Sequence, residues 1–436
     1  MEDEFAQQRC GFFVERKKRW CRMLAKPGRK YCGEHASLET GLDQNRIPCP
    51  FNPKHTIYED QLERHKKLCN ARPKDYEKWF SWNINGKLDA DSANTEDEPQ
   101  PPPRLYDIPP GQVLHFIDRL RAAAHGNIDF HICFCVIQLL DVRVPRDVRT
   151  DPLVEASVAA DKLGEAAAKH SRQASSLVAH LGDAGLLEGD VSFVEMGAGR
   201  GKLSYYVGLC RSHSDYKTSF VLVDKSAARN KYENKSAVSE KNSISFHRIQ
   251  CPIEHLDLSQ VDAVVEARCV VFIWKHLCGA ATDLALNAIA RLLHNTDATR
   301  GISRIAVAAV PCCHHRCQSP VYPAPSAALL TRAGLTPDLW PLLVAVSSWA
   351  TCGMLRQAKM RNHKTPVDPG DVGYEIDERL NLHASEKEEI GRLCKQLLDF
   401  GRLKFLQGLG FEASFVQFVD LSVTPENVML FASKTF

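Results

Sequence analysis

A glycine-rich turn constrains the fold of this chain more than any other feature. The stretch Val191–Ser204 begins as a short apolar run that closes on Glu195 and then continues into an apolar helix start. Three glycines form the turn between them: Gly197, Gly199 and Gly201. Glycines at this spacing allow a tight strand-to-helix turn with positive φ, and a ligand can lie against the backbone and the helix N-terminus. The turn therefore predicts a ligand-binding loop at the end of a β-strand.

Two commoner glycine loops do not fit this stretch. The dinucleotide fingerprint G-x-G-x-x-G requires a glycine where Lys202 stands. The phosphate-binding pattern G-x-x-x-x-G-K-[ST] fails at Met196 and at Leu203. What remains is an acidic residue followed by alternating glycines, which resembles the first motif of class I S-adenosylmethionine-dependent methyltransferases. The resemblance implies that Glu195 and the three glycines hold the methionine and ribose parts of S-adenosylmethionine.

A second carboxylate follows the next expected strand. The run Thr218–Val223 is β-branched and aromatic, and it leads into Asp224, about 25 residues beyond the glycine turn. In doubly wound folds a carboxylate at this place lies beside the ribose of the ligand. We therefore expect Asp224 to accept hydrogen bonds from the adenosine ribose. The alternative, compatible with this role, is an N-cap for a helix over Lys225–Lys235.

The rest of this region alternates apolar runs with helical segments. Three further runs are expected to form strands: Ile244–Ile249, Val270–Ile273 and Ile305–Val310. A long amphipathic helix over Lys387–Leu409 precedes Gly410, an expected C-cap, and a strand pair, Phe415–Val419 and Val428–Ala432, ends the chain. The alternation predicts an α/β fold with a parallel, doubly wound, Rossmann-like sheet. The terminal helix and hairpin resemble the end of the class I methyltransferase sheet.

Cysteine and histidine cluster in the first 69 residues. Two sets follow one another: Cys10, Cys21, Cys32 and His35, then Cys49, His55, His65 and Cys69. Zinc takes four such ligands in a tetrahedron, and a closed set of four marks a structural site. We expect two small zinc modules, over residues 1–40 and 46–75, each holding one ion. The alternative is free buried cysteines with incidental histidines, but this segment has too little apolar content to fold without metal.

The spacing of the second set is the more specific one. His65 and Cys69 lie four residues apart in the helical pattern Tyr58–Leu68, so both face the same side of a helix. Cys49 lies in a turn before that helix. This quartet resembles the CHHC zinc finger of some RNA-associated eukaryotic proteins.

The charge of this N-terminal region indicates what it contacts. Residues 1–80 carry 17 Lys and Arg against 12 Asp and Glu, a net charge of +5. The stretch Arg16–Trp20 interleaves cations with an aromatic ring, and Phe12 and Phe13 precede it. Such surfaces bind phosphates through the cations and stack bases on the rings. We expect the cations to meet RNA, whereas Phe12 and Trp20 are expected to fill the core of the first zinc module.

An acidic and then proline-rich segment follows. Residues 83–104 include Glu96–Pro103, a composition that is typical of a linker. The remaining residues, 105–436, are expected to form one methyltransferase domain with an N-terminal helical extension. Helices are predicted over Leu114–Ala124 and Pro152–Leu181, packed over the sheet or beside its substrate cleft.

Two polar clusters follow the fourth and fifth strands of the expected sheet, at the edge where open α/β folds place their chemistry. Class I enzymes that methylate amines often carry an acidic or amide residue after the fourth strand, where Lys275 and His276 stand here. A lysine or histidine is better suited to deprotonating or orienting a ribose hydroxyl, so we expect these two residues to be catalytic. In the alternative, His276 and Cys278 cap the next helix and line the pocket.

The second cluster follows the fifth strand and consists of Cys312, Cys313, His314 and Cys317. Adjacent cysteines do not easily reach the same tetrahedral ion. We therefore expect these residues to line the ligand pocket rather than to bind a third zinc.

Composition sets broad limits. The chain has 436 residues, a net charge of +2 and 16 cysteines. Cysteines that cluster with histidine indicate metal binding in a reducing compartment rather than disulfides. No apolar run approaches the length of a membrane helix. We expect a soluble intracellular protein of the cytoplasm, the nucleus or both, without membrane or DNA partners.

Taken together, the motifs resemble a known family along nearly the whole chain. The two consecutive fingers, the Glu195 loop, the segment Lys275–Leu284, the segment Pro311–Cys317 and the turn Thr424–Asn427 are similar to the eukaryotic tRNA 2′-O-methyltransferases that act on the fourth nucleotide of the acceptor stem. The resemblance implies methyl transfer from S-adenosylmethionine to a ribose 2′-hydroxyl in tRNAs for glycine, proline and histidine.

One feature of other ribose methyltransferases is missing from the pattern. Their Lys-Asp-Lys-Glu tetrad cannot be placed in this sequence, so the resemblance to those enzymes does not supply the catalytic residues. An alternative from another class is a non-enzymatic RNA-binding zinc-finger protein with a degenerate methyltransferase body. The intact carboxylates and glycines of the expected pocket argue against it. A protein or small-molecule methyltransferase is a third possibility, disfavoured by the basic zinc region.

Overall fold

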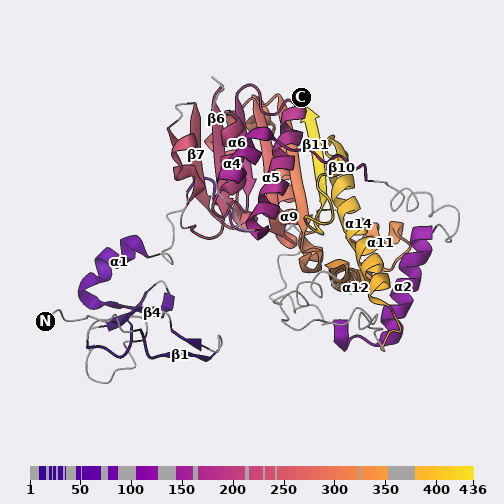
Figure 1. The fold of residues 1–436 in the computed structure, drawn as a ribbon, viewed down its shortest axis with the longest axis horizontal. Helices are drawn as coiled ribbons and strands as arrows, with labels where there is room; N and C mark the ends of the chain where they lie inside the picture. Colours follow the sequence, from indigo (N-terminus) through magenta and orange to yellow (C-terminus); the bar gives the residue numbers. More distant parts are fainter. Residues whose placement is uncertain are drawn as a thin grey trace. The chain divides into compact units, whose positions relative to one another are not determined.

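The fold is known from a computed structural model of the chain. Two compact units are present, Met1–Glu77 and Lys78–Phe436, and each is considered by itself (Figure 1). The residues that the structure describes are 9–15, 19–21, 23–25, 28–32, 35, 46–50, 52–69, 77–86, 105–125, 144–160, 165–211, 216–228, 231–240, 243–323, 326–351 and 379–436.

A seven-stranded sheet organises the second unit (Figure 1). Its strands are β5 (Val191–Met196), β6 (Thr218–Asp224), β7 (Ile244–Gln250), β8 (Cys269–Cys278), β9 (Arg304–Cys312), β10 (Glu412–Gln417) and β11 (Val428–Thr435). They lie in the order β10-β11-β9-β8-β5-β6-β7. β11 runs antiparallel to both neighbours, whereas the four other pairs are parallel. The predicted doubly wound sheet with a closing hairpin is confirmed, and its strand order reverses between β5 and β8.

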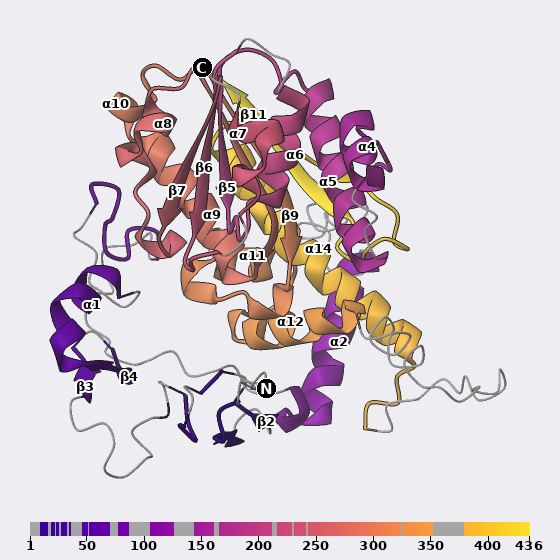
Figure 2. The ribbon, with the colours of Figure 1, turned by 60° about the vertical axis from the view of Figure 1, so that its left-hand side comes forward.

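Helices cover both faces of the sheet (Figure 2). On one face lie α4 (Pro152–Ala160), α5 (Glu165–Asp183), α6 (Lys202–Arg211) and α7 (Ser236–Ser239). On the other lie α8 (Asp262–Val265), α9 (Ala280–His294), α10 (Thr296–Thr299) and the C-terminal part of α14 (Ala384–Gly408). Because side chains alternate along a strand, Phe193 packs on the first face and Val194 on the second.

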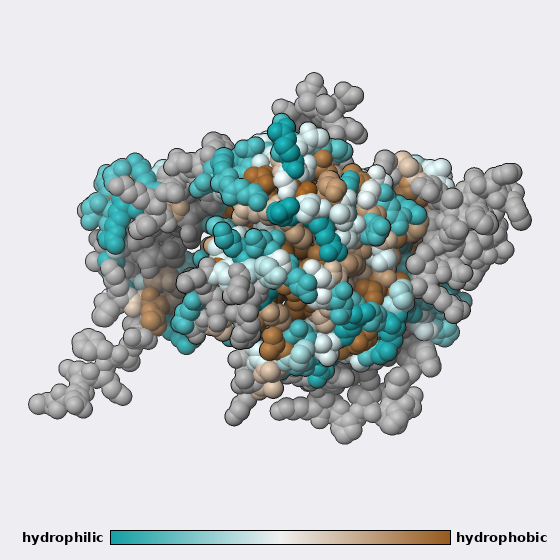
Figure 3. All heavy atoms as spheres, turned by 90° about the horizontal axis from the view of Figure 1, so that it is seen from above, coloured by the Kyte–Doolittle hydropathy of each residue, from teal (hydrophilic) through white to brown (hydrophobic). Residues whose placement is uncertain are grey.

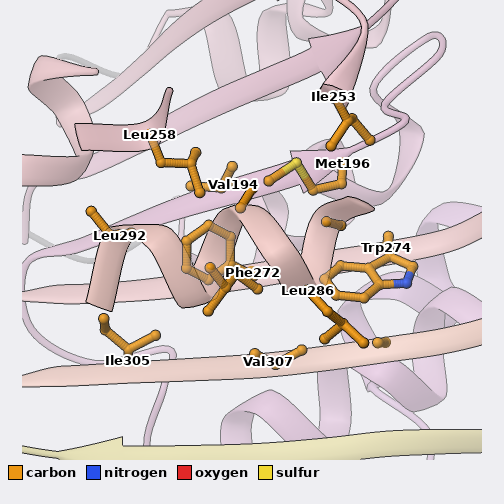
Figure 4. Packing of buried hydrophobic residues seen from close by; sticks show 14 of the residues in the cluster. Val194, Met196, Ile253, Leu258, Phe272, Trp274, Leu286, Leu292, Ile305 and Val307 are labelled. Carbon is orange, nitrogen blue, oxygen red and sulfur yellow. The ribbon is translucent and has the colours of Figure 1, made fainter. Parts of the chain in front are cut away.

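The core on the second face is densely apolar (Figure 4). Phe272 and Trp274 of β8 are fully buried and lie among Val194, Leu286 and Leu292. Full burial of each such side chain contributes about 1.5–3 kcal/mol. This packing fixes the position of β8 beside β5, and hence the edge at which both strands end.

A third cluster of buried residues lies beyond the sheet. It joins α2 (Pro110–His125), α11 (Ser326–Arg332) and α12 (Trp340–Val346) to the N-terminal part of α14. The helix predicted over Leu114–Ala124 lies within α2. Short 3-10 helices complete this unit: η5 (Leu105–Asp107), η6 (Tyr232–Asn234), η7 (Ile253–His255), η8 (Leu258–Gln260), η9 (His314–Arg316), η10 (Ser319–Val321), η11 (Pro337–Leu339) and η12 (Ser347–Thr351).

Two predicted helices differ from the structure. The single helix expected over Pro152–Leu181 is divided into α4 and α5, and residues 161–164 between them lie outside the described part. The long helix begins earlier than expected, at Ala384, where His383 and Glu386 form a capping box. It ends at Gly408, one residue before the predicted end, and Leu409 is its C-cap residue, followed by Gly410 with φ +86°.

Residues 83–86, expected to belong to the linker, are part of the second unit instead. Asn85 is buried and donates to the carbonyls of Ile253 and Leu256, both at 2.7 Å. Trp82 stacks on His255 with ring centroids 4.3 Å apart. Residues 87–104, which include the acidic and proline-rich stretch, lie outside the described residues.

The first unit consists of two small β-modules. β1 (Phe13–Val14) pairs with β2 (Arg19–Trp20), and β3 (Arg46–Cys49) pairs with β4 (Asn52–Tyr58), both antiparallel. A 3-10 turn, η3 (Glu59–Gln61), leads into α1 (Leu62–Leu68), which carries the helical pattern predicted there.

Within the described residues, no helix combines the length and apolarity needed to cross a bilayer.

Seen from above, the face of the molecule at the end where β11 finishes intersperses hydrophobic residues among hydrophilic ones (Figure 3). The chemistry is expected at the opposite edge of the sheet, where the parallel strands end.

One buried cation joins three separate segments of the second unit. Arg402 of α14 is fully buried and donates two hydrogen bonds to Asp283 of α9, at 2.8 and 3.2 Å, and one to Asp399 at 2.8 Å. Its guanidinium also lies 3.0 Å from the sulfur of Cys317. Asp399 in turn binds the ring of His314 in η9 at 2.7 Å. Burial acts to raise the pKa of Asp399, but His314 and Arg402 outweigh it and lower that pKa to about 2.

We expect Arg402→Met to destabilise the second unit strongly, because it leaves Asp283 buried without a cationic partner. Breaking a buried pair from one side costs about 3–5 kcal/mol in the free energy of unfolding. Denaturant unfolding followed by circular dichroism measures this change. Arg300→Met is the matched control, since Arg300 and Asp297 are 81% exposed and their pair contributes little. Equal effects of the two substitutions would contradict the assigned role of Arg402.

Candidate functional site

The glycine turn lies between β5 and α6, as the sequence predicts. Gly197, Gly199 and Gly201 have φ values of +70°, +51° and +75°, which are disfavoured for residues with a Cβ. A Cβ at Gly197 would lie 2.8 Å from the end of the Leu277 side chain in β8. Glycine is favoured at this point mainly by its positive φ, and the close approach of Leu277 adds to this preference.

Glu195 fastens the last part of β5 to the start of α6. Its Oε2 accepts hydrogen bonds from the backbone N–H of Ser204 at 3.0 Å and from the Ser204 hydroxyl at 2.6 Å. Burial raises the pKa of Glu195 to about 7, although the Ser204 hydrogen bonds and the charges of Arg248 and Lys275 oppose the shift. The carboxylate is thus held in place by the protein and is poised to respond to a nearby cation.

Asp224 braces the glycine turn from the end of β6. Its Oδ2 accepts from the backbone N–H of Gly199 at 2.8 Å, and its Oδ1 accepts from that of Ser226 at 2.8 Å. The alternative role as cap of a helix over Lys225–Lys235 is not supported by the described residues of that segment, where η6 is a single 3-10 turn. Instead, the backbone N–H of Tyr232 donates to the carbonyl of Arg200 and folds the segment back onto the turn.

Arg248 of β7 also contacts the glycine turn. It pairs with Glu233 at 2.8 Å and donates to the carbonyl of Gly199, also at 2.8 Å. The sequence motifs did not identify this residue, because only the pairing of β7 with β6 brings Arg248 to the turn.

Lys275 lies where β8 ends, beside the glycine turn. The pairing of β8 with β9 shifts register between Lys275 and Leu277, and His276 between them has φ +65°. Lys275 Nζ donates to the carbonyl of His170 in α5 at 2.9 Å. Burial, with Lys202 nearby, lowers the pKa of Lys275 to about 8, and the Glu195 carboxylate opposes the shift. The structure thus holds an amine with a lowered pKa at the edge of the glycine-turn site.

His276 belongs to the same cluster of basic groups. Its Nε2 lies 3.2 Å from Nδ1 of His170. His276 reaches the surface, but the atoms packed around its ring, together with Lys275 and His170, lower its pKa to about 4. The imidazole is therefore neutral at physiological pH. His276 does not cap α9, because the N-cap residue is Gly279 and no side chain caps that helix.

His170 is a site residue that sequence reasoning missed. It lies on α5, about 100 residues before Lys275, and no motif surrounds it. Burial, with Lys275 and Lys202 nearby, lowers the pKa of His170 as well. The neighbouring basic residues Lys169 and Arg172 are the only signal in the sequence.

The four residues that the sequence grouped after the fifth strand do not form one cluster in the structure. His314 and Cys317 belong to the buried Arg402 cluster. Cys312 and Cys313 meet Cys278 from the end of β8 instead, and the sulfurs of these three residues lie within 4.8 Å of one another. They lie next to the expected active site, but as a separate cluster.

The first four candidate zinc ligands converge in the N-terminal unit. The ligand atoms of Cys10, Cys21, Cys32 and His35 all lie within 4.8 Å of one another. The ring of Phe12 stacks on that of His35 at 3.9 Å, as expected for a residue of the module's core. Burial acts to raise the pKa of the Cys10 thiol, but hydrogen bonds from the backbone of Cys32 and Phe12 outweigh it and lower the pKa.

Three members of the second set also converge. Cys49 Sγ lies 3.6 Å from Cys69 Sγ and 3.2 Å from His65 Nε2. The side chain of the fourth expected ligand, His55, lies outside the described part. Trp20 differs from expectation, because its side chain is 63% exposed rather than packed inside the first module.

Comparison with known proteins agrees with this arrangement. Residues 172–433 match the family described as Methyltransferase TRM13. Residues 8–36 match the CCCH zinc finger in TRM13 protein, and residues 46–70 match the U11-48K-like CHHC zinc finger. These matches agree with the folding of the two zinc-finger modules, which was predicted from cysteine and histidine spacing.

Similar proteins are known from animals and yeasts. The "tRNA:m(4)X modification enzyme TRM13 homolog" of Homo sapiens is 33% identical, over 98% of this chain and 95% of its own length. The mouse protein of the same name is 33% identical, over 97% and 94%. The "tRNA:m(4)X modification enzyme TRM13" of Scheffersomyces stipitis is 29% identical, over 96% and 99%.

Among solved structures, the plantazolicin methyltransferase BpumL is 9% identical, with a TM-score of 0.26 over 74% of this chain and 97% of its own. That score is too low to support an assignment, which rests instead on the sequence families and the strand order. An S-adenosylmethionine-dependent methyltransferase domain and two zinc fingers are joined in one chain, and the chain belongs to the TRM13 methyltransferase family.

Proposed function

We propose that this protein transfers a methyl group from S-adenosylmethionine to the ribose 2′-hydroxyl of nucleotide 4 in the acceptor stem of tRNA, including tRNAs for glycine, proline and histidine. The names of its relatives, which are tRNA:m(4)X modification enzymes, support the substrate. The observation that carries the chemistry is the half-buried Lys275 amine with a lowered pKa beside the glycine turn.

In this proposal the cofactor is held by the turn and its two carboxylates. S-adenosylmethionine supplies an electrophilic methyl group on a cationic sulfur. The turn has the backbone conformation needed for close approach of a ligand, and Asp224 holds it from the next strand. Glu195 is buried, with a raised pKa, and a cationic ligand stabilises its ionised form. These residues therefore fit a ligand that carries positive charge and a ribose.

Lys275 is proposed as the general base. Its neutral amine accepts the proton of the 2′-hydroxyl while the oxygen bonds to the methyl carbon and the methyl–sulfur bond breaks, so the products are a 2′-O-methyl ribose, S-adenosylhomocysteine and a lysine ammonium. A base is most effective when its pKa lies near the working pH, and a value of about 8 meets this condition. A neutral lysine also avoids repulsion of the cationic cofactor.

His276 is proposed to orient the hydroxyl rather than to deprotonate it. With a pKa of about 4 its ring is neutral and only weakly basic at pH 7–8. The contact between its Nε2 and His170 Nδ1 fixes the ring, since one of the two nitrogens donates to the other. The ring then presents a fixed hydrogen-bonding edge next to Lys275.

A cluster of cations and tyrosines beside the glycine turn suits RNA. Arg200 lies over the ring of Tyr232 at 4.8 Å, and Lys235 lies 4.9 Å from the same ring. Lys235 also lies 5.0 Å from the ring of Tyr205, and Lys202 approaches Tyr232 at 6.0 Å. Cations held on aromatic rings can contact phosphates while the rings order them. We propose that this cluster contacts the backbone next to the methylated nucleotide.

The zinc fingers are proposed to dock the acceptor stem. Arg19 and the exposed Trp20 of β2 lie on the surface of the first module, and A-form RNA displays its 2′-hydroxyls in a wide, shallow minor groove. The proposed zinc ligands are the four residues of each set: Cys10, Cys21, Cys32 and His35, and Cys49, His55, His65 and Cys69. The described cysteines form no disulfide, and we propose that the protein works in a reducing compartment, the cytoplasm or the nucleus.

The substrate can be identified directly. The protein is incubated with S-adenosylmethionine labelled in the methyl group, total RNA and total protein, and labelled tRNA is then mapped by nuclease digestion and mass spectrometry. A 2′-O-methyl group on nucleotide 4 supports the proposal. Labelled protein, or no label in any fraction, would favour the protein methyltransferase or the non-enzymatic RNA-binding protein instead.

Cofactor affinity should fall at acidic pH because protonated Glu195 no longer attracts a cationic ligand. With a pKa of about 7, the ionised fraction falls between pH 8 and pH 6, and we expect roughly tenfold weaker binding of S-adenosylmethionine. Calorimetric titration at the two pH values measures this ratio. Glu195→Gln, which can still accept the Ser204 hydrogen bonds, should bind weakly at both. A pH dependence that is the same in the variant would contradict the role of Glu195.

Lys275→Arg should abolish most of the methyl transfer, because arginine stays protonated and cannot act as a base. We expect a rate loss of about 10²–10⁴-fold, measured as single-turnover methylation of tRNA at saturating S-adenosylmethionine, because the fixed charge of arginine also weakens binding of the cationic cofactor. The wild-type rate should rise with pH through about 8 and then level off, because the deprotonated amine is the active form. Lys404→Arg, an exposed lysine of α14, serves as control and should leave the rate unchanged. Retention of the rising pH profile in Lys275→Arg excludes Lys275 as the base.

Removal of the fingers should separate RNA binding from cofactor binding. A fragment that begins at Lys78 keeps the contacts of Asn85 with the second unit, so it should bind S-adenosylmethionine normally. Its RNA affinity should drop and depend less on salt, because fewer cations displace counterions. More RNA should then restore part of the rate. A fragment from Arg104, which lacks the Asn85 contacts, should be less stable. Full activity of the Lys78 fragment would assign the fingers to another partner.

A further inference from the structure

Three thiols converge where β8 and β9 end, and the described residues give them no disulfide. Cys278 and Cys312 are register partners at the ends of these neighbouring parallel strands. Their sulfurs lie 3.7 Å apart, and the sulfur of Cys313 lies within 4.8 Å of both. Cys312 is buried, whereas Cys278 and Cys313 are half-buried, so a small ion can reach the cluster.

The backbone explains how adjacent cysteines reach the same point. Successive side chains of an extended strand point to opposite faces, which is why Cys312 and Cys313 were not expected to share an ion. Cys313 has φ +50°, in the left-handed region. This conformation ends the alternation of β9 directly after Cys312. It is disfavoured for a residue with a Cβ, and such residues concentrate at functional sites.

A close backbone contact brings Cys278 to the pair. The N–H of Gly279 donates to the carbonyl of Cys312 at 3.1 Å. Gly279 has φ +54°, and a Cβ there would clash with the backbone of Arg316. Glycine is therefore needed for the end of β8 to approach the segment after β9. Cys317, the remaining cysteine of that segment, has its sulfur against Arg402 instead.

The separation of the sulfurs suits a metal ion better than a disulfide. A disulfide has an S–S length of about 2.0 Å. Four ligands in a tetrahedron, with a Zn–S length of about 2.3 Å, lie about 3.8 Å apart. The finger cysteines of the same chain show similar spacings, 4.0 Å for Cys21 and Cys32 and 3.6 Å for Cys49 and Cys69.

We propose that Cys278, Cys312 and Cys313 bind a third zinc ion, distinct from those of the two fingers. Three thiolates are the donor set that zinc and other soft ions prefer. The fourth position is left to a water molecule or another exogenous ligand. The ion ties the end of β8, three residues after Lys275, to the end of β9. The inference stands on the cysteine geometry and does not rest on the proposed substrate.

Metal analysis of the full-length protein tests this directly. Elemental mass spectrometry should give three zinc ions per chain for the wild type and two for Cys313→Ser. Cys269→Ser is the matched control, since it removes a half-buried thiol from the other end of β8, and it should keep three. Two zinc ions in the wild type, an unchanged count in Cys313→Ser, or iron in place of the third zinc would overturn the proposal.

A second measurement needs no substitution. In the zinc-loaded protein, alkylation followed by peptide mapping should leave Cys278, Cys312 and Cys313 unmodified until a chelator is added, whereas Cys269 should react equally with and without the chelator. Equal alkylation of Cys278 and Cys313 with and without the chelator would contradict a metal site. So would a peptide in which a disulfide joins Cys278 to Cys312.

Discussion

The buried guanidinium of Arg402 is the interaction on which the active edge of the sheet depends. A charge without solvent must be paired, and its partners Asp283 and Asp399 come from two helices, with His314 bound behind Asp399. Because His314 is the second residue after Cys312, the cluster fixes the segment that leaves β9. The ends of β8 and β9, and with them the Lys275 turn and the three thiols, keep their positions through this contact.

A second constraint acts through the glycine turn. Its motif residues bind one another before they can bind a ligand, since Glu195 accepts from Ser204 and Asp224 accepts from Gly199. This explains why carboxylates and glycines occur together in the motif. The glycines permit the backbone conformation, and the carboxylates hold it. A substitution at Asp224 therefore affects the shape of the turn as well as any direct contact with a ribose.

Features that are set by local chemistry could be predicted from the sequence. The glycine turn, the doubly wound parallel sheet with its closing hairpin, the end of the long helix near Gly410 and the convergence of the first four finger ligands all follow from spacing and residue type. Features that depend on how strands pair and helices pack in the folded chain could not be predicted. Cys278 joins Cys312 only because β8 and β9 pair in that register and Cys313 turns left-handed, and His170 reaches Lys275 only through the packing of α5. The helix expected after Asp224 is replaced by a loop that bonds to the glycine turn instead.

Lys275 and the two histidines of the site have lowered pKa values because they are partly buried and several basic groups lie close together. Lys275, Lys202 and two histidines share one region, and Glu195 is the carboxylate that opposes the lowering of the Lys275 pKa. Each further positive charge favours the neutral forms of its neighbours. A cationic cofactor adds to this effect, so its binding would lower the Lys275 pKa further and ionise Glu195. In the proposed mechanism, cofactor binding and deprotonation of Lys275 are therefore linked through the Glu195 carboxylate and the Lys275 amine.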